Sequence, residues 1–123
     1  MGYRSNVICL MYSASEDDND STKGIIKEFI RQRVTPELFT YFTFDGWGAR
    51  FEAEDWKWYE GYADIDSLMK LFDEYKEAFC EGGYESKYAF EYVRIGESYD
   101  DIETIEEGGS HNRLYVARSI VVD

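Results

Sequence analysis

The strongest constraint on the fold is an apolar run near the start of the chain. Residues 7–12, Val-Ile-Cys-Leu-Met-Tyr, are apolar at both odd and even positions. Successive side chains of a strand point to opposite faces, so this pattern is typical of a central strand that is covered on both sides. We therefore expect a central, doubly covered strand over residues 3–12.

Two later segments have the apolar period of an amphipathic helix. The first, over 22–34, follows a potential cap at Ser21 and ends before Pro36, because proline disfavours helical geometry in the residue that precedes it. The second, over 64–79, is expected to be capped by Asp64. The apolar positions are Ile25, Ile26, Phe29, Ile30 and Val34 in the first helix, and Ile65, Leu68, Met69, Phe72, Tyr75 and Phe79 in the second.

Alternating side chains predict further strands at 49–59, 87–96 and 113–122. Residues 37–47 fit either a short helical turn or the start of a strand. The acidic stretch 97–107 is expected to be a loop. These elements predict one α+β domain spanning residues 1–123, with two helices packed on one face of a four-stranded antiparallel or mixed sheet. The order of elements would be strand, helix, strand, helix, strand, strand.

Charge limits the classes of partner. The 123 residues include 26 acidic and 13 basic side chains, which gives a formal charge of −13. Residues 63–123 hold 15 of the acidic and 6 of the basic residues, so −9 of this charge lies in the second half. Direct binding to nucleic acid or to an anionic membrane needs a basic patch and is not expected. With no apolar run near 20 residues and no leader pattern, we expect a cytoplasmic protein.

Catalytic and metal-binding patterns are weak. Cys9 and Cys80 are isolated, which fits neither a disulfide framework nor a zinc site, and the single histidine, His111, lies in a glycine-rich turn. An EF-hand-like spacing of acidic and polar residues begins at Asp17, but Thr22 stands where the calcium loop requires glycine. We expect neither enzymatic activity nor a cofactor, although loose cation binding by the acidic loops and a metal-assisted enzyme stay open as alternatives.

Clustered carboxylates and aromatic side chains are the candidate partner-binding groups. Rows of negative charge can occupy a site built for phosphates, and tryptophan and tyrosine often anchor protein interfaces. Asp73 and Glu77 are placed to extend such a row along the second helix. The preferred binding residues are Asp100, Asp101, Glu103, Glu106 and Glu107, and the second choice is Glu52, Glu54 and Trp58 as the rim and anchor of a patch. Ordinary core packing of Trp56 and Trp58 is the alternative.

Three segments also carry a resemblance. They are Met1-Gly2-Tyr3-Arg4-Ser5 at the start, the run from Val93 to Ile102, and Val116-Ala117-Arg118-Ser119-Ile120 near the end. Together they resemble small uncharacterised proteins encoded by bacteriophages and prophages, more closely at the two ends than in the middle. The resemblance implies a phage context and assigns no residue a role.

These observations favour a function in protein binding. The expected function is inhibition of a host nucleic-acid-handling defence complex, of the anti-CRISPR or anti-restriction type. Its acidic surface would occupy the basic nucleic-acid site of a host protein in the host cytoplasm. The alternative is a small phage structural or assembly protein that self-associates, and a homodimer is left open.

Overall fold

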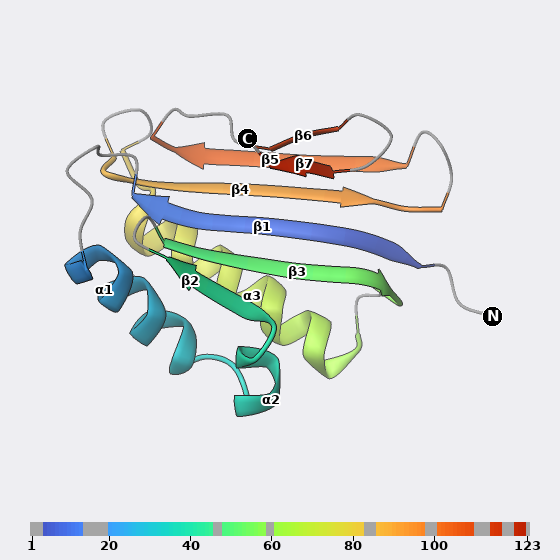
Figure 1. Ribbon diagram of the computed structural model, residues 1–123, viewed down its shortest axis with the longest axis horizontal. Helices are drawn as coiled ribbons and strands as arrows, with labels where there is room; N and C mark the ends of the chain where they lie inside the picture. The colour runs from blue at the N-terminus through green and yellow to red at the C-terminus, as the bar shows by residue number, and fades with distance from the viewer. Residues whose placement is uncertain are drawn as a thin grey trace.

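A five-stranded antiparallel sheet with the strand order β2-β3-β1-β4-β5 forms the centre of the protein (Figure 1). The computed structural model describes residues 4–13, 20–45, 48–58, 61–82, 86–97, 101–109, 114–116 and 120–122. Its elements are β1 (Ser5–Ser13), α1 (Asp20–Arg31), α2 (Pro36–Phe39), β2 (Phe42–Asp45), β3 (Gly48–Trp56), α3 (Ala63–Phe79), β4 (Tyr88–Ile95), β5 (Ile102–Gly108), β6 (Leu114–Val116) and β7 (Ile120–Val122).

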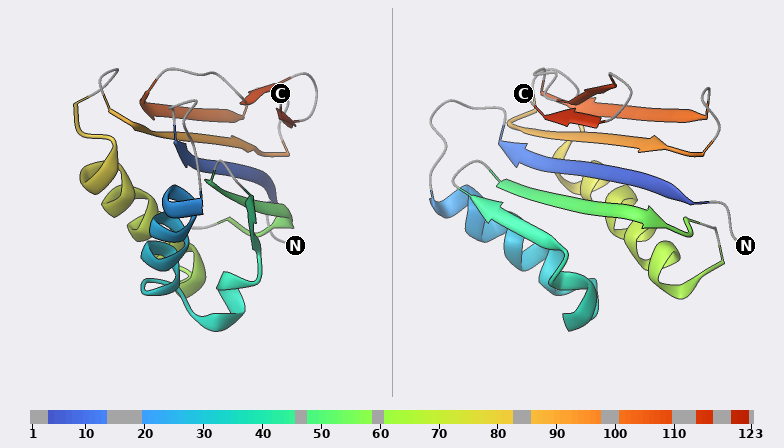
Figure 2. Two further views of the ribbon diagram at one scale, coloured as in Figure 1. Left: turned by 60° about the vertical axis from the view of Figure 1, so that its left-hand side comes forward. Right: turned by 45° about the vertical axis from the view of Figure 1, so that its right-hand side comes forward.

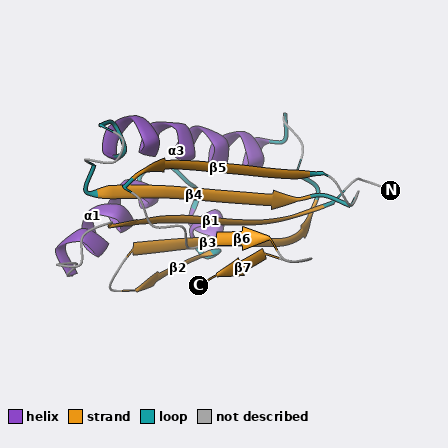
Figure 3. Cartoon of the chain, turned by 90° about the horizontal axis from the view of Figure 1, so that it is seen from above, coloured by secondary structure: helices purple, strands orange, loops and turns teal. Residues whose placement is uncertain are grey.

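Strand β1 lies at the middle of the sheet and is buried on both faces, which confirms the sequence prediction. Val7, Cys9 and Met11 point toward the helices and belong to the main hydrophobic core. The alternate residues of β1, among them Leu10, are also buried. The β6–β7 hairpin lies on that second face, where β6 contacts β4 and β7 contacts β1 (Figure 3).

Helices α1 and α3 both cover the face of the sheet to which Val7, Cys9 and Met11 point (Figure 2). Helix α1 contacts β1 and β3, whereas α3 contacts β4 and β5. Phe72 of α3 joins the two halves of the core, because its ring packs against Phe51 and Phe90 with centroid separations of 6.2 and 5.7 Å. Two helices on one face of the sheet are therefore confirmed, and the short α2 follows α1. Tyr62, and not Asp64, occupies the cap position of α3.

The segment that fitted either a helical turn or a strand contains both. Thr35 is the N-cap of α2, and its hydroxyl accepts a hydrogen bond from the Leu38 amide at 3.2 Å. Proline is well suited to the first turn of a helix, where its missing N–H costs no hydrogen bond. Pro36 therefore starts α2 and does not mark the end of α1, which ends earlier, at Arg31.

The prediction of four strands, and of the order of elements, was wrong. The acidic stretch that was expected to be a loop contains β5, which pairs with β4 from Ile95↔Ile102 to Ala89↔Gly108. The expected last strand is instead two strands, β6 and β7, which pair with each other in a separate sheet. An edge strand such as β5 needs few apolar residues and tolerates charged ones, so its sequence lacks the usual alternation.

A buried carboxylate on the hairpin side of the sheet has a structural role. Glu91 is 4 % exposed, and the Tyr12 hydroxyl donates a hydrogen bond to its carboxylate at 2.5 Å. A buried charged group is tolerated only when hydrogen bonds replace its lost hydration. Glu91 therefore belongs to the interior and is not part of an acidic binding surface.

Candidate acidic binding groove

A groove runs between α3 and the edge strand β5, and carboxylates line both of its walls. It comprises two adjoining hollows of about 720 and 820 Å³, which share Asp73 and Glu77. Its outward-facing carboxylates are Asp66, Asp73, Glu77 and Glu81 on the α3 side and Glu103 and Glu107 on the β5 side. We call these six residues and the space between them the acidic groove.

The periods of the two elements explain this arrangement. Asp66, Asp73 and Glu77 are spaced by seven and four residues, so they lie along one flank of the helix. Glu103 and Glu107 are four residues apart on β5 and therefore point to the same face of the sheet, about 13 Å apart along the strand. Because α3 packs beside β5, the two rows of carboxylates border the same space.

Negative charge is only partly balanced there. The described residues that line the two hollows include two basic side chains, Lys70 and Lys76, besides the six carboxylates and Glu74. Lys76 lies 3.3 Å from Asp73, and Glu74 is paired with Arg33 at 2.8 Å. A concave surface with this excess of one sign of charge attracts and concentrates cationic groups.

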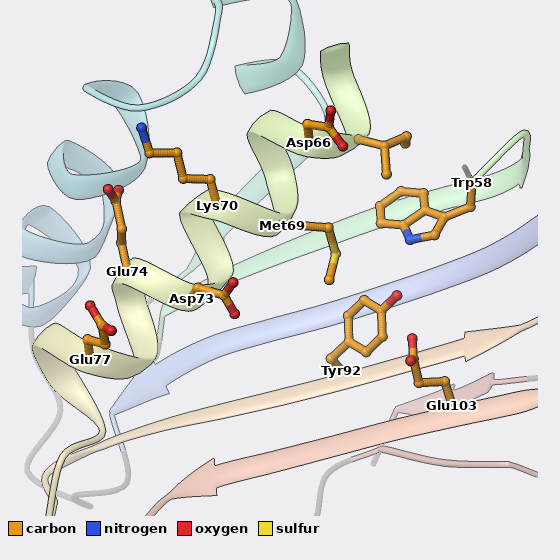
Figure 4. Close-up of a pocket in the computed structure, with 10 residues that line it drawn as sticks. Trp58, Asp66, Met69, Lys70, Asp73, Glu74, Glu77, Tyr92 and Glu103 are labelled. Carbon is orange, nitrogen blue, oxygen red and sulfur yellow. The ribbon is translucent and has the colours of Figure 1, made fainter. Parts of the chain in front are cut away.

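One end of the groove has an aromatic floor. Trp58, Met69 and Tyr92 line it, and Figure 4 shows Asp73 and Glu103 entering from α3 and β5. Tyr92 is 1 % exposed, and its hydroxyl has the Glu103 carboxylate and the Trp58 indole as its polar neighbours. Burial, and next the neighbouring Glu103 carboxylate, raise the pKa of Tyr92, so this hydroxyl stays protonated.

A bulge at the end of β3 places the tryptophans on this side of the sheet. Ala53 pairs with Val7 and Trp56 pairs with Ser5, so β3 has one residue more than β1 over this interval. Asp55 adopts a positive φ of 63° within the bulge, and its amide donates to the Asn6 side chain at 2.7 Å. The extra residue reverses the alternation that was predicted for this strand.

The bulge separates Trp58 from the glutamates with which it was grouped. Trp58 packs against Phe51 with ring centroids 6.0 Å apart, in the layer between sheet and helices. Glu52 is in register with Ile8 on the opposite face of the sheet, and Glu54 is exposed. The predicted patch of Glu52, Glu54 and Trp58 is therefore not formed.

The preferred acidic residues are also divided between locations. Glu103 and Glu107 line the acidic groove, together with Trp58. Glu106 is in register with the buried Glu91 and so points to the hairpin side of the sheet. Asp101 pairs with Arg94, and Asp100 lies outside the described residues. The structure thus unites three of the predicted site residues and adds α3 residues to them.

Asp101 has a structural partner that makes its replacement costly. The Arg94 guanidinium, whose side chain is 18 % exposed, donates to both Asp101 carboxylate oxygens at 2.9 and 3.2 Å and to the Ser5 hydroxyl at 3.2 Å. We expect Asp101→Asn to lower the free energy of unfolding by about 1–3 kcal/mol, because the Arg94 guanidinium loses its hydrogen-bonded carboxylate and keeps the more distant Glu103 carboxylate, 3.6 Å from Nε. Urea denaturation measures this loss. Glu54→Gln, at an exposed site, is the control and should change the free energy of unfolding by less than about 0.5 kcal/mol. An equally small change in Asp101→Asn would contradict the structural role of Asp101.

Asp66, Met69 and Tyr92 are site residues that sequence reasoning did not find. The seven-residue spacing of Asp66 and Asp73 was a usable signal, because it places both carboxylates on one flank of a helix. Tyr92 gave no such signal, since a tyrosine in an alternating strand is most often a core residue.

None of the described helices is long and apolar enough to cross a membrane. Among the residues that the structure describes, no three His, Cys, Asp or Glu side chains form a cluster that could hold a metal ion. The chain matches no family model, no curated protein and no solved structure.

Proposed function

We propose that this protein acts by binding a basic surface of a protein that handles nucleic acid, and not by catalysis. The observation that carries the proposal is the acidic groove, where carboxylates from α3 and β5 border one concave space with few basic residues. A groove of this charge complements a site lined by lysine and arginine. The bound protein would then be blocked from its nucleic acid.

The resemblance to phage proteins supplies the specific form of this proposal. The partner would be a host defence complex, such as a CRISPR effector or a restriction enzyme, and the chain would inhibit it. Electrostatic attraction of the −13 charge would speed association with the partner. The aromatic floor at Trp58 would then slow dissociation, since aromatic anchors account for much of the energy of interfaces.

Self-association is the competing function, and the charge of β5 disfavours it at that edge of the sheet. A second copy paired along β5 would bring Glu103, Glu106 and Glu107 beside the same residues of its partner. Like charges on neighbouring strands are destabilising, and charged edge strands are a common protection against such pairing.

The test compares two double variants that remove the same charge from opposite sides of the sheet. Glu77→Gln with Glu107→Gln removes two of the six carboxylates of the acidic groove, and Glu52→Gln with Glu54→Gln is the matched control. Purified wild type and variants are used to capture proteins from a bacterial lysate, with elution by rising salt and by added DNA or RNA. We expect the wild type and the control to retain a nucleic-acid-binding protein, and the groove variant to retain at least ten-fold less.

Two outcomes would contradict the proposal. Equal loss of binding in both double variants would mean that net charge, and not the groove, is recognised. If no host protein is retained and the mass of the wild type rises with concentration, the self-assembly alternative would replace it.

A further inference from the structure

The outer edge of β5 has room for a further strand. β5 is the last strand of the five-stranded sheet and the uppermost strand of that sheet in Figure 1, and no described strand pairs with its outer side. Its residues are exposed, apart from Ile105 and Gly108, which are half-buried. Extended peptides often bind to other proteins by adding a strand to a sheet edge of this kind.

The pairing with β4 determines which backbone groups of β5 point outward. The Gly109 amide donates to the Tyr88 carbonyl at 3.0 Å, and this pair continues the unbroken register between the two strands. In antiparallel pairing, residues that bond to one neighbouring strand alternate with residues that face the other way. The odd-numbered residues of β5 therefore bond to β4. The even-numbered ones, among them Ile102 and Thr104, direct their N–H and C=O groups to the outer edge.

The side of β5 that faces the acidic groove has an acidic, an apolar and an acidic residue at alternate positions. Glu103 and Glu107 are exposed and line the groove. Ile105 lies between them, is half-buried and packs against the hydrophobic core. In an added antiparallel strand, the residues opposite these three would form the pairs whose side chains approach most closely. Basic, apolar and basic side chains are the complement to this row.

We propose that the outer edge of β5 accepts an antiparallel strand of the protein partner with basic side chains at its first and fifth positions and an apolar one at its third, an inference that rests on the function proposed above. Backbone hydrogen bonds to groups such as those of Ile102 and Thr104 would hold the strand, and its alternate side chains would give specificity. The basic side chains would enter the space that Asp73 and Glu77 of α3 also border (Figure 4). Basic arms of nucleic-acid-binding proteins offer segments of this chemistry.

The direct test uses a capped, fluorescently labelled peptide, Thr-Arg-Thr-Val-Thr-Arg-Thr, and needs no identified partner. Fluorescence anisotropy at low salt measures its binding to the wild type, and NMR follows hydrogen exchange of the Ile102 and Thr104 amides. We expect saturable binding with a dissociation constant in the micromolar to millimolar range, and slower exchange of both amides. A peptide with glutamine in place of both arginines should bind at least ten-fold more weakly. Binding that leaves the exchange of both amides unchanged would overturn the proposal.

N-methylated peptides distinguish strand addition from attraction between charges. In the proposed pairing, the threonines beside valine donate their N–H groups to β5, whereas the N–H of valine faces away. N-methylation of one of these threonines should weaken binding at least five-fold, and N-methylation of the valine by less than two-fold. The two peptides carry the same charge. Equal affinities would overturn the proposal.

Substitutions in β5 test the same contacts from the protein side. Thr104→Pro removes an outward N–H group and leaves the bonds to β4 in place, since proline is tolerated in edge strands where its nitrogen faces outward. It should weaken peptide binding at least ten-fold, whereas Thr104→Ala, which keeps the N–H, should change it by less than two-fold. Glu107→Gln should weaken binding at least three-fold, and Glu106→Gln, on the hairpin side, by less than two-fold. Unchanged binding to folded Thr104→Pro would contradict strand addition, and if this variant does not fold, the N-methylated peptides decide.

Failure of this inference can be told apart from failure of the proposed function. If the peptide adds to β5 but no lysate protein depends on the groove, strand addition stands and the blocking of a nucleic-acid site falls. If a captured protein depends on Glu77 and Glu107 but is held equally by wild type and Thr104→Pro, the groove stands and strand addition falls.

Discussion

Gly108→Ala is expected to be among the most destabilising single substitutions in the described chain. Gly108 ends β5 with φ at +87°, which L-amino acids rarely adopt, and an added Cβ would lie 2.3 Å from the Tyr88 carbonyl oxygen and 3.1 Å from Cys80 Sγ. The oxygen belongs to the backbone of β4, so it cannot move without breaking the pairing. Strain and steric overlap together should lower the free energy of unfolding by about 3–5 kcal/mol.

Two other glycines separate the contributions to this loss. Gly82 also has a positive φ, +107°, but nothing lies within 4 Å of an added Cβ, so Gly82→Ala reports the backbone strain alone, about 1–2 kcal/mol. Gly24 lies in α1 with open space around it, and Gly24→Ala should stabilise the protein by up to about 1 kcal/mol. Urea denaturation of the three variants provides the comparison. A loss in Gly108→Ala no larger than that in Gly82→Ala would mean that β5 can shift to accommodate the methyl group.

The elements with dense apolar patterns were predictable from the sequence. β1 is apolar on both faces because it lies at the centre of the sheet, and α3 has a continuous apolar stripe because one side of it covers the core. β5 escaped prediction because an edge strand obtains its stability from backbone pairing with β4, which leaves little trace in side-chain alternation.

The candidate site was only partly predictable, for two physical reasons. A single bulge at Asp55 moved Trp56 and Trp58 to the face opposite Glu52, and bulges leave a weak signal in one sequence. The meeting of Asp73 with Glu103 depends on how α3 docks beside β5, and such a tertiary arrangement is not encoded in the period of either element.

Alkaline pH is expected to destabilise the protein strongly. Burial raises the pKa of Cys9, Tyr75 and Tyr92, and burial followed by the Glu107 carboxylate raises the pKa of Cys80 from 9.0 to about 12. In the unfolded chain these groups ionise near their ordinary values of 9.0 for cysteine and 10.0 for tyrosine. Above pH 9 the unfolded state therefore holds fewer protons than the folded state, and the free energy of unfolding falls as pH rises. Cys80 alone should account for about 2 kcal/mol between pH 9 and pH 11.

Cys80→Ala identifies the part of this loss that belongs to the thiol. The variant should be less stable than the wild type at pH 7, because it loses buried volume, yet its stability should decline less steeply between pH 9 and pH 11. Urea denaturation at pH 7, 9, 10 and 11 gives the free energy of unfolding of each protein as a function of pH. Repulsion among the growing number of negative charges lowers the free energy of unfolding of both proteins alike. It therefore does not affect the difference between wild type and Cys80→Ala. Parallel curves for the two proteins would show that Cys80 ionises in the folded state as readily as in the unfolded one. That result would contradict the position of Cys80 in the structure, where the thiol is buried between α3 and the end of β5, beside Glu107 of the acidic groove.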